Sequence, residues 1–337
     1  MPIESPRLWS QRQLLLVGGA LVSVLFVLSL FIGQNPLPVL LAAGQSDADI
    51  SATVQMIFTQ IRLPRALITL VIGASLGLCG AAMQSLLRNP LATPGLVGSS
   101  SGAALFAVLV FYLGGGVMSW LLMPLAGTLG SLLAMAFVFA LAGRDSSIVT
   151  LILAGVAVNS LALSLISLVL NLAPSPYAVQ EIVLWTLGSV ANKSLRDFLL
   201  LMPATLAGWW LLRGIGPSLN TLTLGEDTAA TLGVNISRLR WRVFLAVSLA
   251  IGAAVSTAGS IAFVGLVVPH LLRPLVGYEP GRLLPLSAIG GAALLLAADI
   301  VVRLFPGHLD IKIGVITSMV GAPFFLYLIV RTRRTQL

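Results

Sequence analysis

The residues most able to do chemistry begin with Arg62-Leu63-Pro64-Arg65, which opens a long uncharged run. Two guanidiniums beside a proline at the entrance to such a run have two ordinary uses. Their apolar stems can follow the run while the charged heads reach lipid headgroups. Alternatively, they can receive acidic side chains of a partner protein, because charges at the rim of an interface set its orientation and encounter rate. The residues alone leave both interpretations open.

A second candidate is the polar segment LGEDTAATLG at 224–233, between two apolar runs. Acidic residues in its first turn suit the helix dipole, a glycine follows its last turn, and Ala229 and Leu232 predict a small apolar face. So short a helix has little stability alone. We therefore expect it to rest on a cytoplasmic subunit, with a loop packed on its own chain as the alternative. The residues expected to make this contact are Gly225, Glu226, Asp227, Thr228, Ala229, Leu232 and Gly233.

Three further polar residues lie within apolar runs. Asp299 precedes Arg303 by four positions, which predicts an ion pair on one helix face; a proton relay is the second interpretation. His270 follows a proline and is interpreted as structural. Cys79, the single cysteine, is interpreted as a small buried hydrophobe.

Enzyme chemistry is not indicated by this set of residues. The sequence contains no G-x-x-x-x-G-K-[ST] phosphate loop, so the polypeptide is not expected to hydrolyse ATP. Its apolar runs contain no cluster of His, Cys or carboxylates suited to a bare metal ion. We therefore expect no catalytic residue, no metal ligand and no cofactor bound by this chain.

The composition predicts a membrane protein. Of 337 residues, 58% are hydrophobic and 9% charged, and the mean hydropathy is +1.03. Soluble domains are about a quarter charged, so lipid is the expected solvent. The net charge of +8 does not predict a nucleic-acid partner, because the basic residues separate apolar runs and are not interleaved with aromatic ones.

The apolar runs predict an all-α protein with about ten transmembrane helices. The first run is too long for the core of a signal peptide and is interpreted as a retained span. A short helix is also expected near 178–189. The predicted spans are 14–33, 66–87, 95–113, 118–142, 148–170, 198–212, 243–259, 260–272, 283–304 and 313–330.

Basic residues predict the orientation of these spans. Ten spans place both termini on one side of the membrane. With the termini in the cytoplasm, 13 of the 19 Lys and Arg residues lie inside and 6 outside. The excess of positive charge on the inner side supports this orientation.

An internal repeat is indicated by four pairs of residues with one common offset. Gly73, Ala74, Gly80 and Pro90 are each followed 179 residues later by the same residue type. In the predicted topology the two copies run in opposite directions, which is typical of the inverted repeats of transporters. Small residues that serve only close helix packing are the alternative explanation. We therefore predict one transmembrane domain, 1–337, with repeat halves at about 62–190 and 241–331.

Several long motifs, in this order and spacing, resemble the FecCD family of permeases, which import ferric siderophores, haem and cobalamin. The motifs are RLPR, RNPLATPGLVG, LGEDTAATLG, FVGLVVPHLLR, LLLAADIVVR and GVITSMVGAPFF, between Arg62 and Phe325. The resemblance implies a type II ABC importer in the bacterial inner membrane. It also implies a second permease subunit, identical or paralogous, a cytoplasmic ATPase dimer that carries ATP and Mg²⁺, and a periplasmic binding protein.

The resemblance also implies roles for single residues. Gly225 to Gly233 resembles the loop that docks on the ATPase, and Arg62, Arg65 and Arg303 match positions that pair with acidic residues of the binding protein. One departure is Asp310-Ile311-Lys312, where the family usually has Glu-Leu-Pro. A ferric siderophore is the expected cargo, followed by haem and cobalamin. An ion-coupled secondary transporter and a structural or sensory membrane protein are the competing classes.

Overall fold

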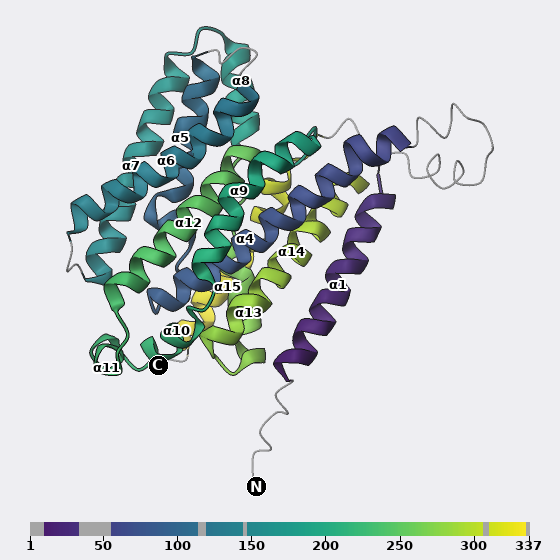
Figure 1. Cartoon of the computed structure of the whole chain (residues 1–337). Helices are drawn as coiled ribbons and strands as arrows, with labels where there is room; N and C mark the ends of the chain where they lie inside the picture. The colour runs from purple at the N-terminus through teal and green to yellow at the C-terminus, as the bar shows by residue number, and fades with distance from the viewer. Residues whose placement is uncertain (1–9, 34–54, 114–118, 144–146, 306–309, 335–337) are drawn as a thin grey trace.

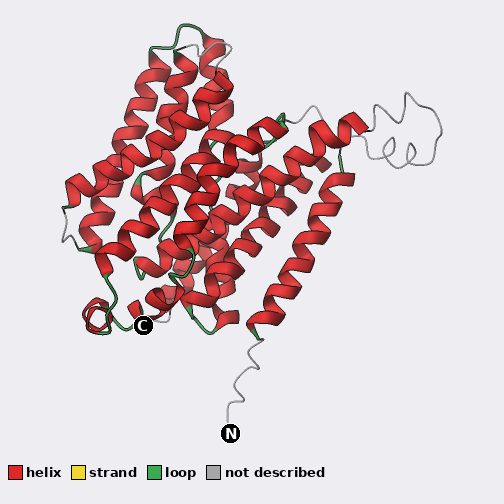
Figure 2. Cartoon of the chain, viewed as in Figure 1, coloured by secondary structure: helices red, strands yellow, loops and turns green. Residues whose placement is uncertain are grey.

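Helices make up all of the regular structure in the computed structural model, which describes residues 10–33, 55–113, 119–143, 147–305 and 310–334 (Figures 1 and 2). In chain order, the first elements are α1 (Gln11–Phe31), η1 (Ile57–Arg62), α4 (Leu63–Leu86), η2 (Pro94–Val97), α5 (Ser99–Tyr112), α6 (Ser119–Ala142), α7 (Ile148–Asn171) and α8 (Pro176–Thr186). The remainder is α9 (Leu195–Leu212), α10 (Gly216–Leu222), α11 (Glu226–Thr231), α12 (Ile236–Ala258), α13 (Val264–Leu272), η4 (Arg273–Val276), α14 (Pro280–Leu304) and α15 (Ile313–Arg334).

The predicted spans correspond to helices. Among the described residues, seven helices are long and apolar enough to cross a membrane, and three shorter apolar helices, in α5, α13 and α15, complete the ten. The short helix expected between the fifth and sixth spans is α8. Helices of these lengths satisfy their backbone hydrogen bonds internally, as lipid requires.

Two predicted spans are shorter than expected because the backbone turns inside them. The span predicted at 95–113 begins as the 3₁₀ turn η2 and becomes α5 only after Gly98, whose φ is 75°. The span predicted at 260–272 becomes helical only at Val264, because Gly259 (φ 72°) and Phe263 (φ 67°) take left-handed conformations. Gly98 therefore makes the turn that opens α5.

Glycines set the closest helix contacts. Gly73 and Gly77 of α4 face α14, where a Cβ on Gly77 would collide with the backbone oxygen of Ser287. Gly252 of α12 faces α6, where a Cβ would lie 2.8 Å from the Cβ of Ser131. Small residues allow such approach in membranes, where van der Waals packing drives helix association.

The helix partners are reciprocal between the two predicted repeat copies. α4 packs against α13 and α14, and α12, which carries the second copy of the motif, packs against α5 and α6. Each first helix therefore contacts the second and third helices of the other copy. A pseudo-two-fold relation between the halves has this consequence.

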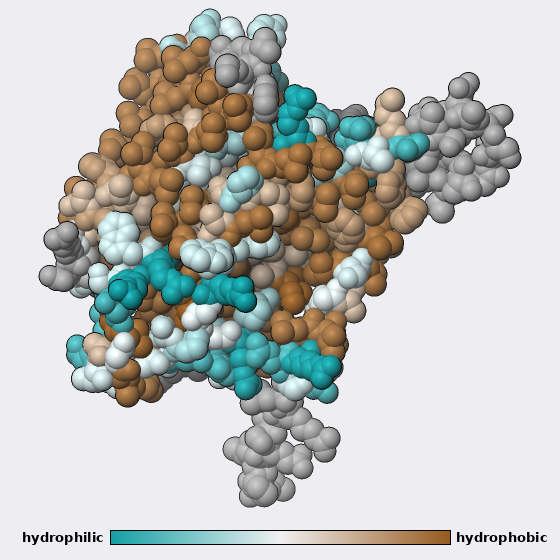
Figure 3. Space-filling view, in the orientation of Figure 1, coloured by the Kyte–Doolittle hydropathy of each residue, from teal (hydrophilic) through white to brown (hydrophobic). Residues whose placement is uncertain are grey.

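Polar and apolar surfaces are separated along the bundle. Figure 3 shows a broad hydrophobic surface, with hydrophilic residues gathered at the end where α10 and α11 lie. The start of α1 and the end of α15 lie at this same end (Figure 1). Large apolar side chains such as Leu153 and Leu168 on α7 are more than half exposed in the single chain, as expected where lipid or another subunit covers them.

Candidate functional site

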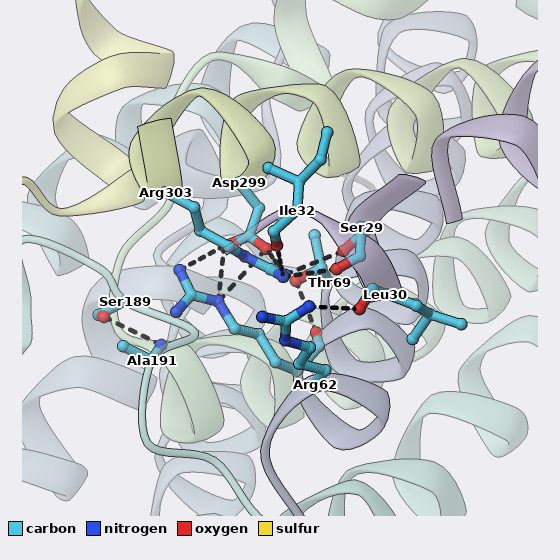
Figure 4. A network of polar contacts seen from close by, with 10 residues as sticks. Ser29, Leu30, Ile32, Arg62, Thr69, Ser189, Ala191, Asp299 and Arg303 are labelled. Atoms are coloured by element: carbon cyan, nitrogen blue, oxygen red, sulfur yellow. Dashed lines mark hydrogen bonds and ion pairs between the residues drawn. The ribbon is translucent and has the colours of Figure 1, made fainter. Parts of the chain in front are cut away.

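Asp299 is the centre of a buried polar cluster near the carboxyl end of α14. Its carboxylate is fully buried and lies between two guanidiniums (Figure 4). Arg65 of α4 donates from Nη2 and Nε to Oδ1, at 2.7 and 2.9 Å, and Arg303 donates from Nη2 to Oδ2. The ion pair predicted between Asp299 and Arg303 is confirmed, with Arg65 as an additional partner. A buried carboxylate held by two cations favours a structural pair over a proton relay.

Two arginines, Arg62 and Arg303, cap the carboxyl end of α1. Arg62 donates from Nη1 to the backbone oxygens of Leu30 and Phe31, at 2.9 and 2.8 Å, and Arg303 donates to that of Ser29 at 2.6 Å. The last carbonyls of a helix have no partner within the helix. The two guanidiniums satisfy them, and thereby hold α1 against α4 and α14.

Burial distinguishes the three arginines predicted to dock a binding protein. Arg62 and Arg303 are each 7% exposed, whereas the side chain of Arg65 is 17% exposed. The cluster contains three guanidiniums and one carboxylate, so it keeps an excess of positive charge at this end of the bundle. The docking role remains a prediction. The structure adds that all three guanidiniums already have partners inside the chain.

The loop 225–233 has the predicted local structure. Helix α11 begins after Gly225, whose φ is 111°, and Gly233, with a φ of 88°, follows the helix end. Both conformations suit glycine, which lacks the Cβ that makes them costly. Glu226 and Asp227 occupy the first turn as expected.

The predicted apolar face on α11 is wrong. Ala229 is fully buried against its own chain, whereas Leu232 is 63% exposed. The physical reason is that Ala229 packs inward against its own chain, whereas Leu232, which follows the helix end at Thr231, is turned to solvent, so the two do not share one exposed face. The exposed apolar side chains of the loop are Leu224 and Leu232, one on each side of α11.

The two acidic residues of α11 have different environments. Glu226 accepts two hydrogen bonds from Nη2 of Arg240, at 2.7 and 2.9 Å, which fastens α11 to α12. Asp227 and Thr228 are exposed. Asp227, Leu224 and Leu232 therefore form an exposed surface, and Glu226 fixes the position of α11 beneath it.

Gln84 is a buried residue that the sequence reasoning did not single out. Pro269 lies inside α13 and has no N–H to donate to the backbone oxygen of Gly265 four residues before it. Gln84 of α4 donates from Nε2 to the oxygens of Gly265 and Leu266, at 3.3 and 3.2 Å, and accepts from Arg273 at 2.7 Å. The proline inside an apolar run is the signal that predicts the need for such a donor.

A cavity of about 630 Å³ lies between α4, α5, α7 and the stretch that precedes α13. The 3₁₀ turn η2 with Thr93 before it, and the non-helical stretch 260–263, both line it. Irregular backbone at membrane depth is tolerated where it lines a cavity. Its polar lining residues are uncharged, and they are Thr93, Ser100, Ser101, Asn159, Thr186 and Ser260.

The described part of the chain contains no group of three His, Cys, Asp or Glu that could hold a metal ion. His270 contacts the ring of Phe324 edge-on, with ring centroids 5.8 Å apart, so it joins α13 to α15. Lys312 donates to Asp310 at 2.7 Å before α15 begins. The unusual Asp310-Ile311-Lys312 segment thus forms a local ion pair.

Comparisons with known proteins agree with this architecture. The FecCD transport family matches residues 21–331. The chain is 38% identical over 325 residues to the vitamin B12 import system permease protein BtuC of Vibrio cholerae, covering 96% of this chain and 95% of that protein. It is 34% identical over 325 residues to the Fe(3+)-citrate import system permease protein YfmD of Bacillus subtilis, covering 90% and 94%.

A solved structure has the same fold. It is described as an inward-facing conformation of a candidate metal-chelate type ABC transporter, and it superposes with a TM-score of 0.84 at 32% identity, covering 95% of this chain and 99% of that one. A family match over most of the sequence and this structural match agree. The chain therefore belongs to the FecCD transport family and is a multi-pass permease of the ABC importer type.

Proposed function

We propose that this chain carries an iron chelate from the periplasm to the cytoplasm, with a ferric siderophore as the leading cargo and haem or cobalamin as the alternatives. The observation that supports this most is the uncharged cavity of about 630 Å³ beside broken helices. Such a cavity provides no ligands for a bare cation. It suits a cargo whose chelator already holds the metal, and one relative is named for an iron complex and another for a cobalt one.

The subunit proposed to drive transport is a cytoplasmic ATPase dimer that rests on the loop 225–233. Leu224 and Leu232 are exposed there with Asp227 between them, so the surface combines apolar contact with a negative charge. ATP and Mg²⁺ belong to the ATPase, because this chain has no phosphate loop. In this proposal, closure of the ATPase pushes on α11, and the repeat halves, about 62–190 and 241–331, tilt against each other.

Two further partners complete the proposed assembly. A second permease subunit, identical or paralogous, covers the exposed apolar side chains of α7. A periplasmic binding protein presents acidic residues to the cationic outer cluster of Arg62, Arg65 and Arg303. Both termini then lie in the cytoplasm, and the chain resides in the bacterial inner membrane.

Uptake by the whole complex tests this proposal and identifies the cargo. The permease, its ATPase and its binding protein are reconstituted in proteoliposomes and offered labelled ferric siderophores, ferric citrate, haemin and cyanocobalamin. We expect uptake of one chelate class that depends on ATP and on the binding protein. Uptake of free ferric iron in preference to every chelate would contradict the proposed cargo.

A further inference from the structure

Asn220 joins the inner loop to the start of α14. It lies on α10, the seven-residue helix that leads into the loop 225–233. Its Nδ2 donates to Oε1 of Glu279 at 2.9 Å, and its Oδ1 accepts from the backbone N–H of Gly281 at 2.7 Å. One amide side chain thus makes a donor bond and an acceptor bond to the same turn of α14.

The bond to Gly281 supplies a cap that α14 does not make for itself. The first backbone N–H groups of a helix have no partner within it, and a side chain at the N-cap usually accepts one of them. Glu279 holds the N-cap position without such a bond, and Pro280, which follows it, has no N–H. Asn220 accepts from Gly281, so α10 caps α14 from another part of the chain.

The backbones of the two elements are close enough to make this joint stiff. A Cβ on Gly216 would lie 3.0 Å from the Cα of Gly281, and a Cβ on Gly281 would lie 3.2 Å from the amide of Asn220. On α10 itself, Leu219 and Leu222 are fully buried. Apolar anchoring fixes where α10 lies, and the amide fixes its rotation relative to α14.

α14 runs from this joint to the outer cluster. It begins at Pro280, beside Asn220, and ends one residue after Arg303, which pairs with Asp299. At about 1.5 Å per residue, a helix of 25 residues extends roughly 36 Å. Because α11 follows α10 after three residues, a displacement of α11 reaches α14 through the joint.

We propose that Asn220 is the positioning residue that couples the ATPase-docking loop to α14, and through it to the outer arginine cluster. This inference rests on the proposed function. The role requires both the Nδ2 donor and the Oδ1 acceptor of the Asn220 amide. An aspartate at this position keeps the acceptor for Gly281 but places a second carboxylate against Glu279.

The test compares Asn220→Asp, the double variant Asn220→Asp with Glu279→Gln, and Asn235→Asp as the matched control. Asn235 caps α12 by accepting from the backbone of Arg238 at 2.8 Å, a bond that aspartate also makes. Each permease is reconstituted with its ATPase and binding protein. Three quantities are measured: co-purification of the ATPase, ATP hydrolysis, and uptake of the chelate that the wild-type complex transports.

Asn220→Asp should co-purify with its ATPase and hydrolyse ATP within about twofold of the wild-type rate, while uptake per ATP falls at least about tenfold. Glu279→Gln should restore uptake per ATP to within about threefold, because its amide donates to the new carboxylate. Asn235→Asp should match the wild type. Wild-type uptake by Asn220→Asp would overturn the inference, as would a double variant no better than the single one. Failure of the wild-type complex itself to use ATP would instead overturn the proposed function.

Should Asn220→Asp not assemble, Glu279→Ala provides the second variant. It removes the acceptor for Nδ2, together with the half-exposed ion pair of Glu279 with Arg282, and leaves the bond from Gly281 in place; Arg282→Gln, which removes only that ion pair, is its control and should keep uptake per ATP unchanged. A drop in uptake per ATP of about threefold or more in Glu279→Ala, with assembly intact, supports the coupling role. Unchanged uptake per ATP in Glu279→Ala overturns it.

Discussion

Arg65 and Asp299 lie 234 residues apart in the sequence and are joined in the structure by an ion pair of 2.7 Å. The pair connects α4 to α14, which also meet along the glycines of α4. One residue belongs to each predicted repeat half. An ion pair therefore holds α4 and α14 together near the carboxyl end of α14, and close backbone packing holds them together along their middle.

Replacing Asp299 should destabilise the permease more than replacing an exposed acid. Asp299→Asn leaves the guanidiniums of Arg65 and Arg303 buried without their carboxylate. Breaking a buried pair costs about 3–5 kcal/mol, which for a chain of this size lowers the Tm by roughly 5 °C or more. Thermal unfolding of the detergent-purified permease measures this. Asp310→Asn is the control, because Asp310 pairs with Lys312 at an exposed site, and its Tm should change little. Equal Tm values for the two variants would contradict the assigned role of Asp299.

Substitutions of Arg65 and Arg303 should affect docking and stability differently. Arg65 is the more exposed of the two, whereas Arg303→Gln would remove one of the two cations on Asp299 and also the donor to the backbone oxygen of Ser29 at the end of α1. We expect Arg65→Gln to weaken binding-protein affinity about tenfold or more at low salt, with a smaller effect at high salt because exposed charges are screened. Arg303→Gln should lower the Tm further than Arg65→Gln does. Pull-down affinities at two salt concentrations and thermal unfolding provide both readouts. Undiminished docking by Arg65→Gln would remove that residue from the interface.

Gly77 should tolerate no side chain. In Gly77→Ala the new Cβ collides with the backbone oxygen of Ser287, and no rotamer change relieves a backbone contact. Overpacking of this kind costs about 1–3 kcal/mol. At Gly19 of α1 a Cβ meets nothing within 4 Å, so Gly19→Ala should keep or raise the Tm, since alanine favours helix by about 1 kcal/mol. Membrane yield and Tm distinguish them, and a Gly77→Ala permease as stable as Gly19→Ala would show that the α4–α14 contact is looser than described.

The two acids of α11 should respond differently to charge reversal. Glu226→Arg breaks the pair with Arg240 and should reduce ATPase stimulation, and Arg240→Glu in the same chain should restore it by reversing the pair. Asp227→Lys should also reduce stimulation, but Arg240→Glu should not restore it, because Asp227 points to solvent. ATP hydrolysis of the reconstituted complex measures each step. Rescue of Asp227→Lys by Arg240→Glu would mean that the two acids do not have separate roles.

Cysteine labelling should confirm the orientation. The single native cysteine, Cys79, is fully buried, so it should not react in the folded permease. Tyr177→Cys, at an 81% exposed position in the first turn of α8, should react with a membrane-impermeant maleimide in intact spheroplasts. Leu232→Cys should react only after the membrane is opened. The reverse pattern would invert the proposed topology.

The sequence predicted most of the helices and the local structure of α11 because those features are local. A long apolar run needs no distant partner to be a helix in lipid. Likewise, α11 begins after Gly225 and ends before Gly233 because of the backbone conformations of these two glycines. The error at Leu232 was also local, since this residue follows the helix end and is turned to solvent.

The features that the sequence could not predict depend on residues far apart in the chain. Arg303 reaches Ser29 across 274 positions, and Gln84 reaches the carbonyl of Gly265 across 181. Asn220 lies close to the loop 225–233 in the sequence, but its side chain bonds to Glu279, which is distant in the sequence. Periodicity and caps carry no information on such partners, because close packing of the helices brings them together.

The energy source for uptake is the most direct test of the account. Proteoliposomes containing the permease, ATPase and binding protein are loaded with ATP or left without it, and uptake of the transported chelate is measured with and without a protonophore. The account predicts that uptake requires ATP and continues when the proton gradient is collapsed. Uptake that persists without ATP and stops on adding the protonophore would contradict it and identify an ion-coupled transporter instead.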